Sequence, residues 1–168
     1  EAGLNSLALA NNEHAGTSVA DVLQAHYKQY GRNFFSRYDY EEVESAGAQT
    51  MMSELRAKVT DPAFLGSTQG SFKVAEAGDF SYTDPIDHSV SKNQGLYVRM
   101  EDGSRIVFRL SGTGSAGATI RLYVEKYSSM AAEYAADVQE ALRPIIDVAL
   151  QLSALQRHTG RKEPTVIT

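Results

Sequence analysis

Apolar and polar side chains alternate along two stretches in the second half of the chain. Every second residue is apolar from Ile106 to Leu110 and again from Ile120 to Val124. A period of two puts these apolar side chains on one face of a strand, so both stretches predict strands buried on one side. Glycine-rich residues separate them. The pattern therefore predicts an antiparallel hairpin, with strands over 104–110 and 118–127, closed by a glycine-rich turn.

The remaining spacing predicts further helices and strands. Ser18 followed by Asp21 is a capping-box-like start for a helix over 19–30, with Gly31 as its C-cap. Strands are predicted over 33–40, 72–80 and 96–100, with turns at 78–79 and 102–103 and loops over 64–70 and 81–95. Helical spacing predicts a helix that Glu41, Glu42 and Glu44 open and Pro62 ends, then helices over 131–141 and 144–156, the last with Pro144 in its first turn.

This order of elements indicates an α+β fold, in which helices cover one face of an antiparallel sheet. A chain of 168 residues can bury a sizeable core as one domain. Hydrophobic residues make up 42% and charged residues 22%, as in ordinary globular proteins. No apolar run approaches the ~18 residues of a membrane-spanning helix, so we expect no membrane partner.

Charge and cysteine content exclude several classes of function. The net charge of −5 argues against a general nucleic-acid binder, because such proteins need a basic face. The chain has no cysteine, which rules out disulfides and thiolate metal sites. Its four histidines are not at metal-ligand spacing, and His88 with Asp84 or Asp87 is expected to be a solvated loop cluster rather than a catalytic pair. We therefore expect no metal site in the chain, and any anion site must be local.

One stretch, RLSGTGSAGATIR over 109–121, concentrates groups that bind anions. Its glycines let backbone amides approach a ligand closely, and successive inward amides form a concave anion site. Hydroxyls add small donors, and arginine forks match phosphate oxygens two at a time. Arg109 and Arg121 are equidistant from Ser115, so a simple hairpin places them side by side on the polar face. Adjacent cations repel unless an anion lies between them, and we infer a phosphoryl group.

The glycine spacing alone also fits other anion sites, which the flanking residues argue against. Gly112-x-Gly114-x-x-Gly117 matches the dinucleotide fingerprint, but that motif needs a following helix, and residues 118–125 predict a strand. A kinase glycine loop lies between strands, yet the other kinase motifs and the Lys-Ser/Thr ending of a P-loop are missing. Two alternatives stay open: a nucleotide-binding hairpin, whose adenine pocket and metal carboxylates we do not find, and a plain hairpin with surface arginines.

Several motifs together resemble one known family. They are YGRNFFSRYDYEEVE at 30–44, DGSRIVF at 102–108, the stretch 109–121, and TGR at 159–161 with PTVIT at 164–168. From about Ser18 to its last residue the chain resembles the C-terminal domain of the phosphoglucomutase branch of the α-D-phosphohexomutases. The resemblance implies a sheet of the TATA-binding-protein type, a name that describes shape and carries no DNA binding. Residues 1–17 depart from the family and are interpreted as a boundary segment of the preceding domain or an altered linker, with 18–168 as the phosphate-binding domain.

The resemblance also implies a function and a site. The family interconverts glucose 1-phosphate and glucose 6-phosphate through glucose 1,6-bisphosphate, with Mg²⁺. The implied partners are the phosphosugar and the three preceding domains of the same enzyme, in the cytoplasm or, alternatively, a plastid. The family's contacts to the non-reacting phosphate match Arg109, Ser111, Gly112, Thr113 and Arg121, and the residues that shape the loop match Gly114, Ser115 and Gly117.

Three other family motifs are absent from the chain. These are the phosphoserine motif Ser-His-Asn-Pro, the metal-binding run Asp-Gly-Asp-x-Asp-Arg and the sugar-selecting Gly-Glu-Glu/Ser loop. We therefore expect no catalytic residue and no turnover by these residues alone. Mg²⁺ and glucose 1,6-bisphosphate are expected only for the full-length enzyme. The alternative is a non-catalytic relative that acts as a structural or interaction protein, although a scaffold need not retain both arginines.

Overall fold

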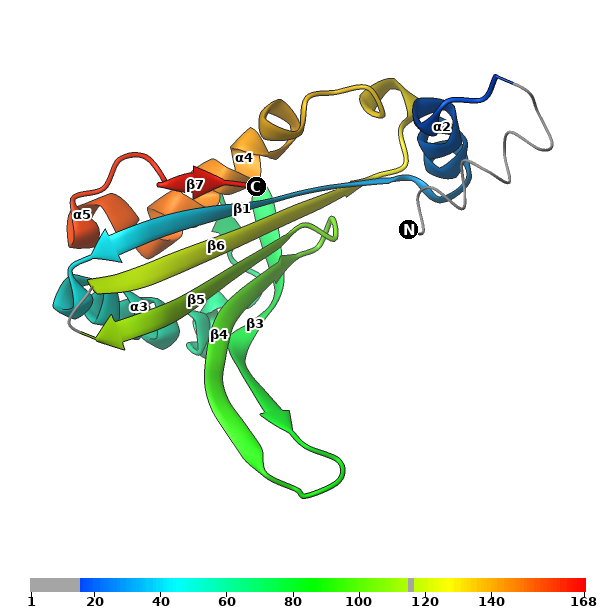
Figure 1. Cartoon of the computed structure of the whole chain (residues 1–168). Coiled ribbons are helices and arrows are strands. Elements are labelled where there is room, and N and C mark those ends of the chain that lie inside the picture. Colours follow the sequence, from blue (N-terminus) through cyan, green and yellow to red (C-terminus); the bar gives the residue numbers. More distant parts are fainter. Residues whose placement is uncertain (1–15, 115–116) are drawn as a thin grey trace. The chain divides into compact units, whose positions relative to one another are not determined.

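The computed structural model describes residues 16–114 and 117–168 (Figure 1). The chain divides into two compact units, Glu1–Asn33 with Tyr127–Asp137 and Phe34–Lys126 with Val138–Thr168. Buried hydrophobic side chains gather in the second unit. In the part of the chain that the structure describes, no helix is both long and apolar enough to cross a membrane.

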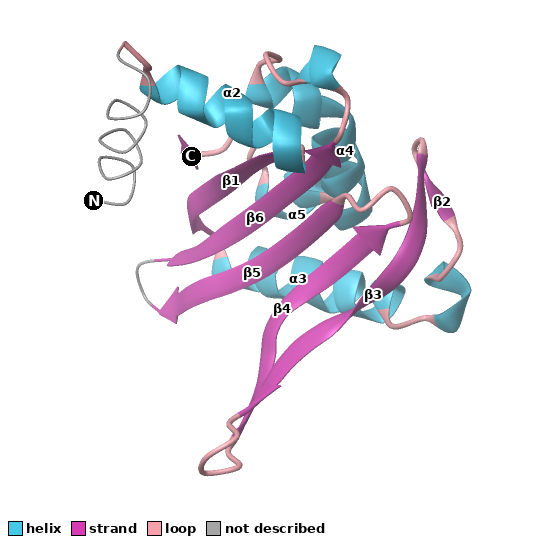
Figure 2. Ribbon diagram, turned by 90° about the vertical axis from the view of Figure 1, so that its right-hand side faces the viewer, coloured by secondary structure: helices cyan, strands magenta, loops and turns pink. Residues whose placement is uncertain are grey.

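An antiparallel sheet is the main element of the second unit (Figure 2). The described strands follow the order β2-β3-β4-β5-β6-β1-β7 across it. Their bounds are β1 Arg32–Val43, β2 Thr68–Gln69, β3 Phe72–Thr83, β4 Val90–Met100, β5 Arg105–Gly114, β6 Gly117–Ser128 and β7 Val166–Ile167. Strands β5 and β6 lie at the centre, so the predicted hairpin occupies the middle of the sheet. The α+β prediction is confirmed.

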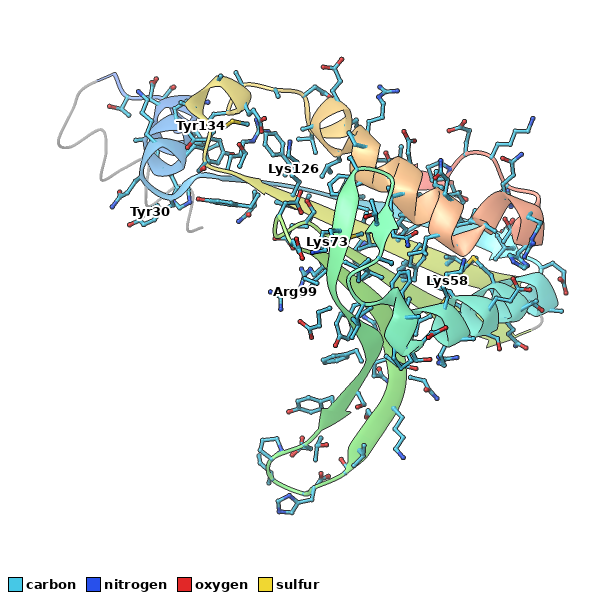
Figure 3. The ribbon with its side chains drawn as sticks, turned by 180° about the vertical axis from the view of Figure 1, so that it is seen from behind. Tyr30, Lys58, Lys73, Arg99, Lys126 and Tyr134 are labelled. Atoms are coloured by element: carbon cyan, nitrogen blue, oxygen red, sulfur yellow. The ribbon has the colours of Figure 1, made fainter. Side chains whose placement is uncertain are left out.

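Three helices of the second unit, α3 Ser45–Val59, α4 Val138–Ser153 and α5 Leu155–Thr159, lie behind the sheet in Figure 2. They bury its apolar face, to which β5 and β6 contribute Ile106, Phe108, Ile120 and Leu122, each at most 1% exposed. Lys58 of α3 ties two helices together by donating to the carbonyl of Leu152 at 2.9 Å (Figure 3). Because the helices cover one face, the alternate side chains of the strands are left on the opposite, outer face.

The first unit is built around α2, Val19–Tyr30, which has the predicted bounds. Its capping box is present: the Asp21 amide donates to the Ser18 hydroxyl at 3.2 Å, and the Ser18 amide donates to the Asp21 carboxylate at 2.8 Å. The chain leaves the helix at Gly31 with φ +81. A side chain at that position would lie 2.3 Å from the Tyr127 hydroxyl, so only glycine fits. Tyr127 also donates to the carbonyl of Tyr30 at 2.9 Å, which fastens the end of α2.

The predicted start of the helix after β1 is wrong. Glu41 and Glu42 belong to β1, and α3 begins directly after Glu44, whose carboxylate caps it by accepting two backbone amides at 2.9 and 2.7 Å. The backbone of Glu41 is held from the C-terminal segment: its amide donates to the Thr165 hydroxyl and its carbonyl accepts from Arg161, both at 3.0 Å. These contacts with the distant C-terminal segment extend β1. The local spacing of apolar residues carries no information on such contacts.

Residues 81–95 are not one long loop, because most of them belong to strands, and the turn predicted at 78–79 is also wrong. Strand β3 continues to Thr83 and β4 starts at Val90, with Tyr82 paired to Ser91 in an antiparallel ribbon. The ribbon extends past the last pair of β4 with β5, Leu96 with Phe108, and is exposed along most of its length. Without a buried side it has no one-sided alternation of apolar residues, so the sequence pattern did not indicate strands.

The cluster of His88, Asp84 and Asp87 lies in the short turn between these strands. One Asp84 carboxylate oxygen accepts the amides of Ile86 and Asp87, at 2.7 and 3.2 Å. Hydrogen bonds from Ser89 hold the pKa of Asp87 below its ordinary value. The carboxylates thus stabilise the turn, as expected of Asp in tight turns.

Pro144 does not start a helix. It lies inside α4, which begins at Val138, and residues 131–133 form a short 3-10 helix instead of the predicted longer one. Leu142 and Ile145 on either side of the proline are buried, at 0% and 1% exposure. Burial of this apolar stripe outweighs the one backbone hydrogen bond that proline removes. The helix then breaks at Ala154, whose φ is +49, before α5.

Candidate anion-binding site

The hairpin of β5 and β6 has the predicted register. Arg109 lies directly opposite Arg121, and Ser111 lies opposite Thr119. The register then shifts, so that Gly114 pairs with Gly117. The shift coincides with the positive φ of Gly112, +65, a conformation that favours glycine. A strand rather than a helix follows the glycines, which excludes the dinucleotide fingerprint.

Arg109 lies on the outer face of the sheet, next to β4. Its Nε donates to the carbonyl of Gln94 at 3.0 Å. Its side chain lies against Gly95, where a Cβ would come within 3.1 Å of the Arg109 Cγ. Among the described residues no carboxylate is within ion-pair distance of Arg109. The side chain is thus fixed at Nε while the charge of the guanidinium is not neutralised by an acid.

Arg121 lies on the other side of the pair, next to β1. Its side chain is 41% exposed, and its Nε lies 3.7 Å from Oδ2 of Asp39. That Nε is buried and has no hydrogen-bond acceptor. The other Asp39 oxygen accepts from Arg37 Nε at 2.9 Å. Asp39 therefore lies within ion-pair distance of two arginines. The cationic side chains lie on the neighbouring strands β1, β6 and β5, in the order Arg37, Arg121, Arg109.

Other arginines on this face are paired with acids. Arg105 contacts Glu125 at 2.6 Å. Arg99, labelled in Figure 3, contacts Glu76 at 2.8 Å. The Tyr97 hydroxyl also donates to Glu76, at 2.9 Å, and this hydrogen bond to the carboxylate raises the pKa of Tyr97. Toward the glycine turn the pairing is weaker: among the described residues Arg109 has no acid within ion-pair distance, and Arg121 has only Asp39 at 3.7 Å.

The outer face carries two hollows, one of which is lined by Arg109. One hollow of about 480 Å³ is lined by residues of β3, β4 and β5, including Tyr97, Val107 and Arg109. Another of about 450 Å³ is lined by Phe35, Arg37 and Tyr123 among others. The first hollow leaves space beside Arg109 for a ligand larger than a bare ion.

The glycine turn lies close to the end of β1. Gly117 has φ +91, and a Cβ built there would lie 3.1 Å from the Cα of Glu42 and 3.2 Å from the carbonyl oxygen of Val43. Glycine is therefore required both by conformation and by space. Ser111 is exposed on the rim. Ser115 lies outside the described residues, as does the side chain of Thr113, so their predicted roles stay predictions.

Sequence reasoning missed Asp39 and Arg37. Both belong to β1 at a spacing of two, which is the signal that places them on one face of a strand. Their relation to Arg121 depends on β1 pairing with β6, which the local pattern does not give. Among the described residues, no three His, Asp or Glu side chains come together as a metal site.

Known proteins are similar to this chain in fold and in sequence. Residues 32–165 match the family described as Phosphoglucomutase-1, C-terminal domain. Phosphoglucomutase-1 of Homo sapiens is 54% identical over 155 residues, which cover 90% of this chain and 28% of that protein. The phosphoglucomutase of Schizosaccharomyces pombe is 52% identical over 168 residues, 99% of this chain and 29% of that protein. The solved structure of pp63/parafusin, an exocytosis-sensitive phosphoprotein and phosphoglucomutase from Paramecium in its open form, aligns with a TM-score of 0.80 and 45% identity over 94% of this chain and 27% of that one.

The fold and the hairpin define an α+β domain that presents paired arginines beside a glycine turn. The chain belongs to the phosphoglucomutase family and corresponds to the C-terminal domain of its members. It spans 23% of the length of the chloroplastic phosphoglucomutase 1 of Marchantia polymorpha and 29% of that of the Schizosaccharomyces pombe enzyme.

Proposed function

We propose that this chain is the phosphate-gripping domain of a phosphoglucomutase. In this role it holds the non-reacting phosphate of glucose 1-phosphate, glucose 6-phosphate or glucose 1,6-bisphosphate. The phosphoryl group at the other end of the sugar is transferred on the remaining domains. The resemblance assigns the grip to Arg109, Ser111, Gly112, Thr113 and Arg121, with Gly114, Ser115 and Gly117 shaping the loop.

The observation that carries this proposal is the direct pairing of Arg109 with Arg121. Like charges opposite each other on a sheet are destabilising, so the pair needs a compensating anion. Within this pair only Arg121 has an acidic neighbour among the described residues, Asp39 at 3.7 Å, and Arg109 has none. A phosphate dianion between the two guanidinium groups supplies the missing charge and accepts two forks of hydrogen bonds.

The grip contributes to catalysis at a distance. Binding energy from the non-reacting phosphate orients the sugar, so that the opposite end meets the transferring group in a productive geometry. The same grip suits either phosphosugar, because the reaction exchanges which phosphate reacts. Arginine is suited to this role because its charge does not change with pH and its planar fork fixes the angle of the bound phosphate.

The chemistry of transfer lies outside these residues. The family's phosphoserine and metal-binding motifs are absent from the sequence, and Mg²⁺ ligands are therefore proposed on the preceding domains. The non-catalytic alternative keeps the same domain. The pair of arginines favours the enzyme, since a scaffold gains nothing from two opposed cations that destabilise the sheet.

Phosphorus NMR of glucose 1-phosphate tests the proposal in one sample. We expect the substrate resonance to shift and broaden when the chain is added, and we expect no glucose 6-phosphate to form after Mg²⁺ and glucose 1,6-bisphosphate are added. Two competitors are added in turn, unphosphorylated glucose and ATP. Neither is expected to displace the phosphosugar at equal concentration. Formation of glucose 6-phosphate contradicts the absence of catalysis. An unperturbed resonance contradicts the grip, and displacement by ATP favours the nucleotide-binding hairpin.

A further inference from the structure

We propose that Asp39 is the positioning residue of this phosphate site, and that it aims the guanidinium of Arg121 at the ligand. The inference rests on the proposed function, because it needs a phosphate gripped by Arg121. It adds a residue outside the glycine hairpin, on a different strand. Its role is to act through Arg121 without touching the ligand.

The Asp39 carboxylate is held in a fixed place. The residue is 3% exposed, although it carries a charge and belongs to the outer layer of the sheet. Its carbonyl accepts the Thr165 amide at 2.7 Å, and it pairs with Val166 of β7. On the side chain, Oδ1 accepts from Arg37 Nε at 2.9 Å. Backbone pairing and the Arg37 contact thus leave the other oxygen, Oδ2, turned toward Arg121.

The Nε group of Arg121 has a single acidic neighbour among the described residues. Asp39 Oδ2 lies 3.7 Å away, too far for a hydrogen bond but within ion-pair range. The same Nε is buried and has no acceptor. A buried donor without an acceptor is costly, so a small rotation of Arg121 toward Asp39 is favourable. When Nε contacts Asp39, the terminal N–H groups of Arg121 face the ligand. The Arg121 side chain then loses less conformational entropy when phosphate binds.

Coulomb repulsion alone predicts the opposite change in phosphate affinity when Asp39 is neutralised. The experiment can therefore distinguish a positioning role from simple charge repulsion. A carboxylate close to a phosphate repels it, so removing the charge of Asp39 should strengthen phosphate binding if only Coulomb terms matter. If Asp39 positions Arg121, removing the charge should weaken binding, because the guanidinium loses its fixed orientation. The sign of the change therefore reports the role.

The test is inorganic phosphate binding to the wild-type chain, Asp39→Asn and Glu125→Gln, measured by calorimetry. Glu125→Gln is the matched control, because it removes one carboxylate from the same face but only from the partner of Arg105, 2.6 Å away. We expect Asp39→Asn to weaken binding roughly tenfold, by analogy with the loss seen when the hydrogen-bond partner of a metal ligand is removed. We expect Glu125→Gln to leave binding unchanged or slightly stronger. If the wild-type chain binds phosphate and Asp39→Asn binds it equally tightly or more tightly, the positioning role of Asp39 is wrong. The proposed phosphate grip is not affected by that result.

A second measurement uses the native chain, in case Asp39→Asn does not fold. Hydrogen exchange of the arginine Nε groups is followed by nitrogen NMR as phosphate is added. We expect the Arg121 Nε–H to exchange more slowly in the bound state, because its contact with Asp39 shortens, while the Arg105 Nε–H stays unchanged. Unaltered exchange at Arg121 in a saturated sample overturns the inference and leaves the grip intact. Absence of phosphate and phosphosugar binding by the wild-type chain overturns both.

Discussion

Replacing Arg121 by alanine is expected to weaken glucose 1-phosphate binding by roughly 10- to 100-fold, the cost of losing charge-assisted hydrogen bonds to an anion. The free energy of unfolding should change little. The side chain is 41% exposed and its only acidic neighbour among the described residues lies at 3.7 Å, so it contributes little to the fold. Removing one of two opposed cations also relieves repulsion with Arg109.

The Arg121 prediction is checked by calorimetric titration together with thermal melting of the same samples. Arg99→Ala is the matched control: it removes a cation of the same face, but one that is paired with Glu76 at 2.8 Å and lies opposite Arg105, at the end of β5 away from the glycine turn. We expect that control to bind the phosphosugar like the wild type. Equal affinities for Arg121→Ala and the wild type, with both folded, would show that the hairpin does not grip phosphate.

Gly117→Ala is expected to lower the free energy of unfolding by about 2–3 kcal/mol. The loss combines backbone strain at this position with a steric clash between the new Cβ and β1. The position has φ +91, which an alanine adopts only with strain, and the new Cβ would lie 3.1 Å from the Cα of Glu42. Relief requires β1 and the hairpin to separate by a few tenths of an ångström. Because β1 also carries Asp39, the same variant should weaken phosphosugar binding.

Gly103→Ala is the control for Gly117→Ala, because both glycines have a similar positive φ but different surroundings. Gly103 has φ +87, and an added Cβ would meet no atom within 4 Å, so its substitution reports backbone strain alone. We expect a loss of about 1 kcal/mol there in chemical denaturation. Equal losses for the two variants would mean that the approach of β1 to the glycine turn does not constrain the hairpin.

The sequence predicted the hairpin well because its pattern is local. One strand face is buried under the helices, so Phe108 and Leu122 recur in an alternation that a short window detects. The pairing of Arg109 with Arg121 then follows from symmetry about the turn. Helix α2 was predictable for the same reason, since its capping box lies within three residues.

Elements that depend on distant partners escaped prediction. The ribbon of β3 and β4 has no buried side, and Pro144 is tolerated only because α4 packs its apolar stripe against the rest of the core. Strand β7 is two residues long and exists through its pairing with Tyr38 and Asp39. Asp39 lies beside Arg121 only because β1 is the neighbour of β6 in the sheet. A pattern of local periodicity carries no information on strand order.

An amide-shift titration of this chain with glucose 1-phosphate shows whether the glycine hairpin binds the phosphate of the sugar. We expect saturable shifts confined to residues 111–117 and the neighbouring arginines, similar shifts with inorganic phosphate at higher concentration, and none of comparable size with unphosphorylated glucose. Such a result means that the chain itself grips the phosphate. A folded chain whose 111–117 amides do not move at any phosphosugar concentration would contradict the claim.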